Sequence, residues 1–251
     1  MDPLRHAKLS DQYEFYPCLV DGAPASIYLN LRFEDEERVA SENTAYWLAV
    51  KMLDEGEYGI GTAEEAELLN AIEEAVIARA STAGLHYVGR VRTGGIWEMT
   101  FYGPAGHVDL IRGAANDLAI GRKTEVRSQT DADWSYYRDF MLPDAERRQW
   151  MDDRRLVQIL KEQGDALVTP RRVDHRATFT TAAARDAFVE TLRTQRFEAA
   201  PHADDTSGSF GAHVFRTDPI ELDHIHDVVM IVVDAARAHG GAYAGWKTEI
   251  R

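Results

Sequence analysis

The chain has 251 residues, of which 45% are hydrophobic and 28% charged, a globular composition that is long enough for two domains. The formal net charge is −14, and most of the excess acid lies in the first 150 residues. This acidity disfavours polyanions such as RNA as partners and favours basic partners. The alternative interpretation is that the acidity only keeps the protein in solution.

Alternating apolar and polar side chains predict a leading strand over residues 25–33. A second strand is predicted at 44–53, where a helix is the competing interpretation because Ala, Leu, Lys and Met favour helices. Thr62 and Glu65 form a capping box that predicts the start of a helix ending at Gly84. The other elements expected in this half are strands at 85–92 and 96–102, a helix at 106–120 and a strand at 122–128.

Pro143 and Asp144 open a charged helix that runs to about Gln163. We place a domain boundary here, which gives domains of residues 1–147 and 148–251. Asp218, Pro219 and Glu221 are expected to begin a later helix as N-cap, first-turn proline and capping acid. The elements expected in the second half are strands at 173–180, 196–201, 209–216 and 242–250, helices at 181–195 and up to residue 239, and a turn at 202–208.

Each half therefore has the element order β-α-β-β-α-β, with one extra leading strand in the first half. This order predicts an α+β protein made of two ferredoxin-like α/β sandwiches. The string KTEVR at 123–127 is echoed by KTEIR at 247–251. Both copies are expected on the final strand of their half, which favours an internal duplication.

Several strings resemble known families. The segments DRRLVQILKEQGD, RRVDHRATFT and AYAGWKTEI, within residues 152–251, resemble the regulator of ribonuclease activity B (RraB) family. The segments EFYPCLVDGAPASIYLNL, GLHYVGRVRTGG and TDADWSYYRDF, within residues 10–143, are similar to the DUF695 domain, a family of unknown function. The first resemblance implies a protein that binds ribonuclease E and restrains its cleavage of RNA. Neither resemblance implies a catalytic residue or a cofactor.

Side chains suited to catalysis or metal binding are scattered along the sequence. His224 and His226 lie two residues apart on the expected last helix, so they point about 200° apart and cannot share a metal ion. Cys18 is the only cysteine, which excludes an intramolecular disulfide, and we expect it to be a small packed residue. Glu98 and Glu125 are expected to pair with Arg or Lys, and the alternative is an acid-base pair formed by the two on neighbouring strands. No G-x-S-x-G, Walker or G-x-G-x-x-G motif occurs.

Direct RNA binding is an alternative, because a ferredoxin-like order is also that of RNA-recognition motifs. Residues 208–215 (GSFGAHVF) lie on the strand that would carry the RNA-binding consensus. Only Phe210, Gly211 and Phe215 match that consensus. The poor match and the overall acidity disfavour this alternative.

The sheet face that the helices leave open is the predicted contact surface. Alternation places Arg176, Thr178, His213, Phe215, Tyr243 and Lys247 on this face, and Ala177, Phe179, Phe210, Ala212, Val214, Ala244 and Trp246 toward the helices. The predicted partner-binding residues are Arg176, His213, Phe215, Tyr243 and Lys247, because aromatic and cationic groups recur in protein contact centres. The alternative is that the first domain covers this face. The aromatic residues expected to pack between the domains are Trp134, Tyr136, Tyr137 and Phe140.

These observations predict a cytoplasmic, non-catalytic protein-binding regulator without a cofactor, and the resemblance implies ribonuclease E or a similar RNA-processing enzyme as the protein partner. No apolar run reaches the roughly 18–20 residues that a membrane span needs, and no secretion signal opens the chain. The main rival is an enzyme or small-ligand-binding protein with its site between the two domains.

Overall fold

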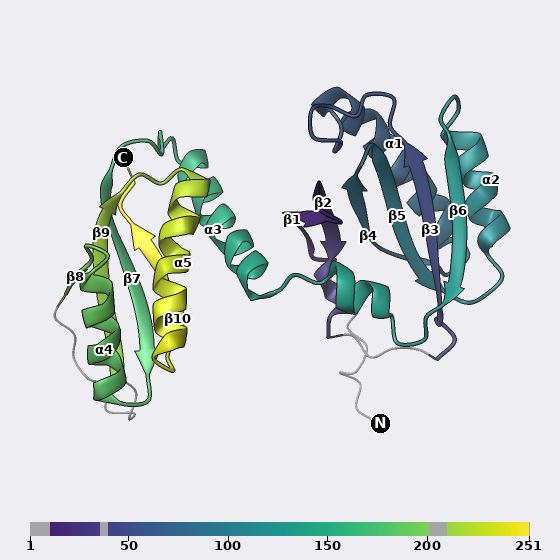
Figure 1. Cartoon of the computed structure of the whole chain (residues 1–251). Helices are drawn as coiled ribbons and strands as arrows, with labels where there is room; N and C mark the ends of the chain where they lie inside the picture. Colours follow the sequence, from purple (N-terminus) through teal and green to yellow (C-terminus); the bar gives the residue numbers. More distant parts are fainter. Residues whose placement is uncertain (1–10, 36–39, 201–209, 251) are drawn as a thin grey trace. The chain divides into compact units, whose positions relative to one another are not determined.

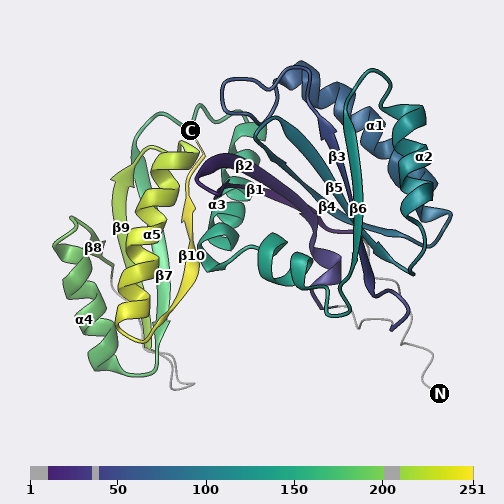
Figure 2. The same cartoon turned by 45° about the vertical axis from the view of Figure 1, so that its right-hand side comes forward.

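The computed structural model describes residues 11–35, 40–200 and 210–250 (Figure 1, Figure 2). The chain divides into two compact units, Met1–Arg147 and Arg148–Arg251. Each unit has an antiparallel sheet and helices in the ferredoxin-like order, which confirms the predicted fold class. Within the described ranges, no helix combines the length and apolar character that crossing a membrane would need.

The first unit is built on a six-stranded sheet in the order β1-β2-β4-β5-β3-β6. Its strands are β1 (Tyr13–Val20), β2 (Ala23–Asn30), β3 (Thr44–Lys51), β4 (His86–Thr93), β5 (Ile96–Gly103) and β6 (Thr124–Thr130). The last four strands in the sheet order form the ferredoxin-like core, and β1 and β2 add a hairpin beside β4. The prediction of a single leading strand is therefore wrong by one strand. Pro17 lies in β1, where a proline is tolerated because β1 is an edge strand.

Helices α1 (Ala63–Ser81) and α2 (Val108–Leu118) pack on one face of this sheet (Figure 2). The N-cap half of the capping prediction for α1 is confirmed, because the hydroxyl of Thr62 accepts a hydrogen bond from the Glu65 amide at 3.3 Å. The reciprocal half of the capping box is wrong, because the carboxylate of Glu65 accepts from the Leu53 amide and from Arg122 instead. The strand prediction at 44–53 is also confirmed, since β3 spans Thr44–Lys51 and pairs with β5 and β6.

Replacement of Thr62 by Ala is expected to lower the unfolding free energy of the first unit by about 1 kcal/mol, because one amide at the start of α1 loses its acceptor. Thr62→Ser keeps the hydroxyl and should retain most of that stability. Urea unfolding followed by circular dichroism measures both variants. Equal stability of Thr62→Ala and the wild type would contradict the capping role.

The aromatic segment after β6 forms a short π-helix, η2 (Tyr136–Met141). Trp134 is buried and stacks on Tyr102, with 4.1 Å between the ring centroids. Tyr137 is also buried, and its hydroxyl donates to the carbonyl of Asn30 at 2.7 Å. The prediction that these aromatic residues pack between the domains is wrong for Trp134 and Tyr137, which belong to the interior of the first unit.

The second unit has a four-stranded sheet in the order β10-β7-β9-β8. Its strands are β7 (Arg171–Phe179), β8 (Glu198–Ala199), β9 (Phe210–Asp218) and β10 (Ala242–Thr248), and its helices are α3 (Ala145–Glu162), α4 (Ala182–Arg193) and α5 (Leu222–Ala238). The predicted turn at 202–208 lies outside the described residues. The N-cap prediction for Asp218 is wrong: α5 begins after Glu221, and Asp218 is the last residue of β9.

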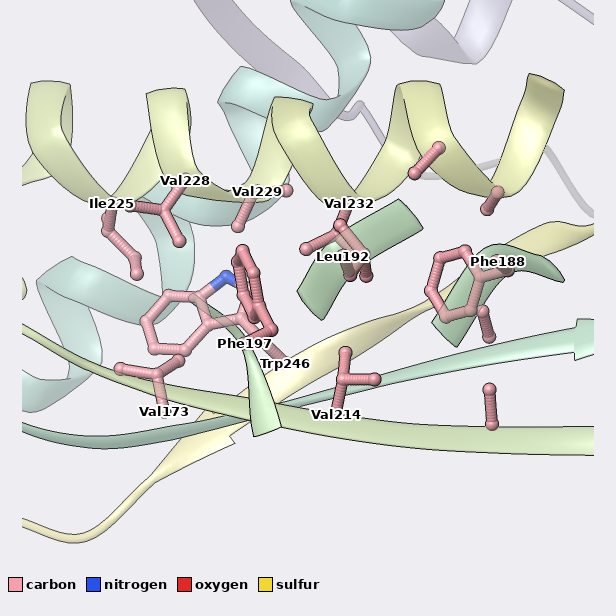
Figure 3. Packing of buried hydrophobic residues seen from close by; sticks show 14 of the residues in the cluster. Val173, Phe188, Leu192, Phe197, Val214, Ile225, Val228, Val229, Val232 and Trp246 are labelled. Carbon is pink, nitrogen blue, oxygen red and sulfur yellow. The ribbon is translucent and has the colours of Figure 1, made fainter. Parts of the chain in front are cut away.

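The core of the second unit lies between its sheet and α4 and α5. Figure 3 shows Val228, Val229 and Val232 of α5 pointing toward the strand residues Val173, Val214 and Trp246. Helix α3 is joined to this core through Asp153, a fully buried carboxylate. It accepts hydrogen bonds from Trp246 at 2.8 Å and from Gln149 at 2.9 Å, and it pairs with His226 at 2.9 Å.

The two copies of the repeated string occupy different places in their strands. Thr124 begins β6, whereas Lys247 and Thr248 end β10. Residue 251 lies outside the described residues. The string therefore does not mark equivalent positions, and the argument for duplication rests on the shared element order alone.

Candidate protein-binding face

In the part of the second unit that the structure describes, α4 and α5 pack on one face of the sheet and the other face carries no helix (Figure 3). Residues opposite each other on neighbouring strands share a face. Arg176 lies opposite His213, Asp174 lies opposite Phe215, and Lys247 of β10 lies opposite Asp174. The structure thus places four of the five predicted residues, Arg176, His213, Phe215 and Lys247, on this helix-free face.

Tyr243, the fifth predicted residue, lies on the opposite face. The register of β10 shifts between Tyr243 and Trp246, where Gly245 has a φ of +100°. This bulge turns both aromatic side chains toward the helices and leaves Ala244 exposed. The hydroxyl of Tyr243 is 3.0 Å from Nδ1 of the buried His175. Strict alternation failed here, although an isolated glycine within a strand is a known signal for a bulge.

The centre of the helix-free face is a cluster of side chains that hold one another. The guanidinium of Arg172 lies 3.6 Å from the ring centroid of Phe215. Its Nε and Nη2 donate to one oxygen of Asp174 at 2.9 and 2.7 Å, and Nε2 of His213 is 2.7 Å from the same oxygen. The sequence-based set omitted Arg172 and Asp174. Arg172 was missed because the strand was predicted from residue 173, whereas β7 begins at Arg171.

Electrostatics keep this cluster assembled at neutral pH. Partial burial by itself would raise the pKa of Asp174, but hydrogen bonds from Arg172 and His213 lower it below the ordinary value. Asp174 is therefore ionised and holds Arg172 over Phe215. Arg176 and Lys247 are exposed, and neither has an ion pair or hydrogen bond among the described residues. They are the free cations of this face.

The residues considered for catalysis or metal binding do not converge. His224 pairs with Asp218 at 2.9 Å, whereas His226 pairs with Asp153 of α3. Across the described ranges, no three His, Cys, Asp or Glu side chains come close enough to hold a metal ion. Cys18 is half-buried, and burial raises the pKa of its thiol, which lowers the fraction of reactive thiolate.

Glu98 has structural partners in the first unit. It accepts from Arg127 at 3.0 Å and from the hydroxyl of Tyr136 at 2.9 Å. The predicted pairing with a basic residue is confirmed for Glu98. Glu125 lies on β6 opposite Ala49 of β3.

A pocket of about 410 Å³ lies between α1 and strands β1, β2 and β4. Its buried acid is Glu73, which accepts hydrogen bonds from Trp97 at 2.7 Å and from Arg90. Burial raises the pKa of Glu73 despite these partners. The Arg90 guanidinium is itself fixed over the rings of Tyr28 and Trp97, at 4.4 and 4.2 Å from their centroids. Glu73 and Arg90 are thus paired with each other, and Glu74, the other acid that lines the pocket, is exposed.

Comparisons with known proteins agree with the two-unit division. Residues 11–142 match the model of a family of unknown function, DUF695, and residues 150–248 match the model of Regulator of ribonuclease activity B, RraB. No curated protein matches the chain.

Two solved structures show only a weak likeness to the chain. One, an unknown protein from Galdieria sulphuraria, has 10% identity over 80% of this chain and 96% of its own, with a TM-score of 0.24. The other, a putative glycine cleavage system transcriptional repressor, has 9% identity over 82% of this chain and 98% of its own, with a TM-score of 0.25. At these scores, neither structure bears on function.

Proposed function

The chain belongs to the DUF695 family through residues 11–142 and carries a Regulator of ribonuclease activity B domain at residues 150–248, and from this premise we propose that it is a regulator that binds a ribonuclease and restrains it without catalysing a reaction. The target we propose is ribonuclease E or a related RNA-processing enzyme in the cytoplasm. The second unit supplies the contact through its helix-free face.

The observation that carries this proposal is the preassembled cluster of Arg172, Asp174, His213 and Phe215. An arginine stacked on an aromatic ring is the type of residue pair that dominates the energy of protein interfaces. Because Asp174 already holds Arg172 in place, the partner does not have to order this side chain on binding.

The same cluster disfavours RNA as the direct ligand. RNA-recognition sheets stack bases on exposed aromatic faces. Here one face of Phe215 is covered by Arg172, and the carboxylate of Asp174 lies at the centre of the surface, where it would repel a phosphate.

Replacement of Phe215 by Ala tests this function. We expect the affinity for purified ribonuclease E to fall tenfold or more, which corresponds to at least about 1.4 kcal/mol, because Arg172 loses the ring on which it packs. Binding is measured by calorimetry, and regulation by the rate at which the ribonuclease cleaves a labelled RNA. Unfolding curves establish that the variant is folded.

Tyr58→Ala is the matched control, because Tyr58 is an exposed aromatic residue of the first unit. This variant should bind and inhibit like the wild type. If the wild-type chain neither binds a ribonuclease nor slows RNA cleavage, the regulatory proposal fails. The same holds if only nucleic acid is retained by the chain at physiological salt.

A further inference from the structure

The charge of the helix-free face is opposite in sign to that of the whole chain. Among the described strand residues, three cations, Arg172, Arg176 and Lys247, lie on it together with two carboxylates, Asp174 and Glu198. One of these carboxylates, Asp174, is already bound by Arg172 and His213. The chain as a whole has a formal net charge of −14. A locally cationic surface on an acidic protein is therefore a feature of this face and not of the general composition.

The spacing of the cations follows from the strands that carry them. Arg172 and Arg176 lie on β7, four residues apart on the same face, which corresponds to about 13 Å at roughly 3.3 Å per residue. Lys247 lies on the neighbouring strand opposite Asp174, between them along the sheet. Side chains on one side of an extended peptide recur about every 7 Å. Acidic residues at alternate positions of such a peptide would match this spacing.

We propose that this face recognises an acidic segment of its target, in extended conformation, with Lys247 and Arg176 binding successive carboxylates beside the Arg172–Phe215 pair. The inference rests on the proposed function and names the chemistry of the partner. Arg176 and Lys247 are suited to this because they have no carboxylate partner of their own in the described chain. Complementary charge accelerates association and excludes basic partners, which the acidity of the rest of the chain would otherwise attract.

Charge reversal tests the inference in the full-length protein. The variant Arg176→Glu/Lys247→Glu is expected to bind purified ribonuclease E at least tenfold more weakly than the wild type, and the wild-type affinity should fall as salt rises from low to moderate concentration. The control Lys123→Glu/Lys161→Glu changes the net charge by the same amount at exposed positions that are not part of this face. It should bind within about threefold of the wild type.

Short probes identify the chemistry directly. A labelled twelve-residue peptide with glutamate at alternate positions is compared by fluorescence anisotropy with a lysine peptide of the same pattern and with a twelve-nucleotide RNA. We expect the acidic peptide alone to bind, and charge reversal at Arg176 and Lys247 to abolish its binding.

The outcomes separate the two proposals. If the ribonuclease binds the wild type but charge reversal leaves its affinity unchanged, the acidic partner is wrong and the regulatory function stands. If the acidic peptide binds and the ribonuclease does not, the recognition chemistry stands and the regulatory function fails. Preference for RNA or for the lysine peptide overturns the inference.

Discussion

Replacing Asp165 by Asn is expected to lower the free energy of unfolding of the second unit by about 3–5 kcal/mol. Asp165 and Arg171 form a buried ion pair at 2.8 Å, with side chains 0% and 1% exposed. In the wild type, the Leu167 amide donates to a carboxylate oxygen of Asp165 at 2.7 Å. Asparagine keeps an oxygen that can accept this hydrogen bond, so the turn retains it. What the substitution removes is the charge that neutralises a buried guanidinium.

The effect is large because breaking a buried ion pair costs much more free energy than forming it contributes. A buried pair contributes little net stability, because desolvation of both charges offsets their attraction, but an unpaired buried charge is costly. The double variant Asp165→Asn/Arg171→Met removes both charges and should recover most of the lost stability. Asp234→Asn breaks an exposed pair with Arg237 and should cost less than about 1 kcal/mol. Urea unfolding of the four proteins measures these differences, and similar losses for Asp165→Asn and Asp234→Asn would refute the argument.

Much of the fold follows from local patterns in the sequence. The alternation in β7 and β9 and the helical spacing in α4 and α5 fix which residues form the core of the second unit. Strand β1 could not be recognised in this way, because Pro17 interrupts a pattern that otherwise suits a strand. A proline is compatible with β1 only because the strand is at the edge of the sheet, and edge position is a property of the whole sheet.

The candidate site was predictable in part. Strand alternation placed Arg176, His213 and Phe215 on one face, because those strands run without interruption. The bulge at Gly245 moved Tyr243 to the core, where it contacts His175. A strand-by-strand pattern gives no distances, so it could not show which side chains hold one another.

The partners of His224 and His226 also depend on the tertiary fold and not on local sequence. Asp218, His224 and His226 are close in sequence, but their spacing alone does not give their partners. The fold separates them, because His224 pairs with Asp218 while His226 pairs with Asp153, which is 73 residues away. Asp153 comes from α3, and no local pattern connects that helix to α5.

A buried histidine makes the stability of the second unit depend on pH. Burial lowers the pKa of His175 to about 4, and of the smaller effects the charge of Asp218 raises this pKa while the charge of Arg216 lowers it. The unfolded chain, with an ordinary pKa near 6.5, therefore binds a proton more readily than the folded chain. Stability from this residue is complete above pH 6.5 and is lost as the pH falls toward 4. Since one pKa unit corresponds to about 1.4 kcal/mol, the loss amounts to about 3 kcal/mol.

His175→Gln is expected to remove this pH dependence, because glutamine stays neutral throughout the range. Its unfolding free energy should lie below that of the wild type at pH 7, since the fitted imidazole is lost, and the difference should shrink by about 3 kcal/mol between pH 6.5 and 4. Tyr243→Phe removes the hydrogen-bond partner of His175 but keeps the aromatic ring packed against the core, so it should keep the wild-type pH dependence. The measurement is urea unfolding at half-unit steps of pH. A constant difference between His175→Gln and the wild type would mean that His175 is protonated in the folded protein, which its complete burial opposes.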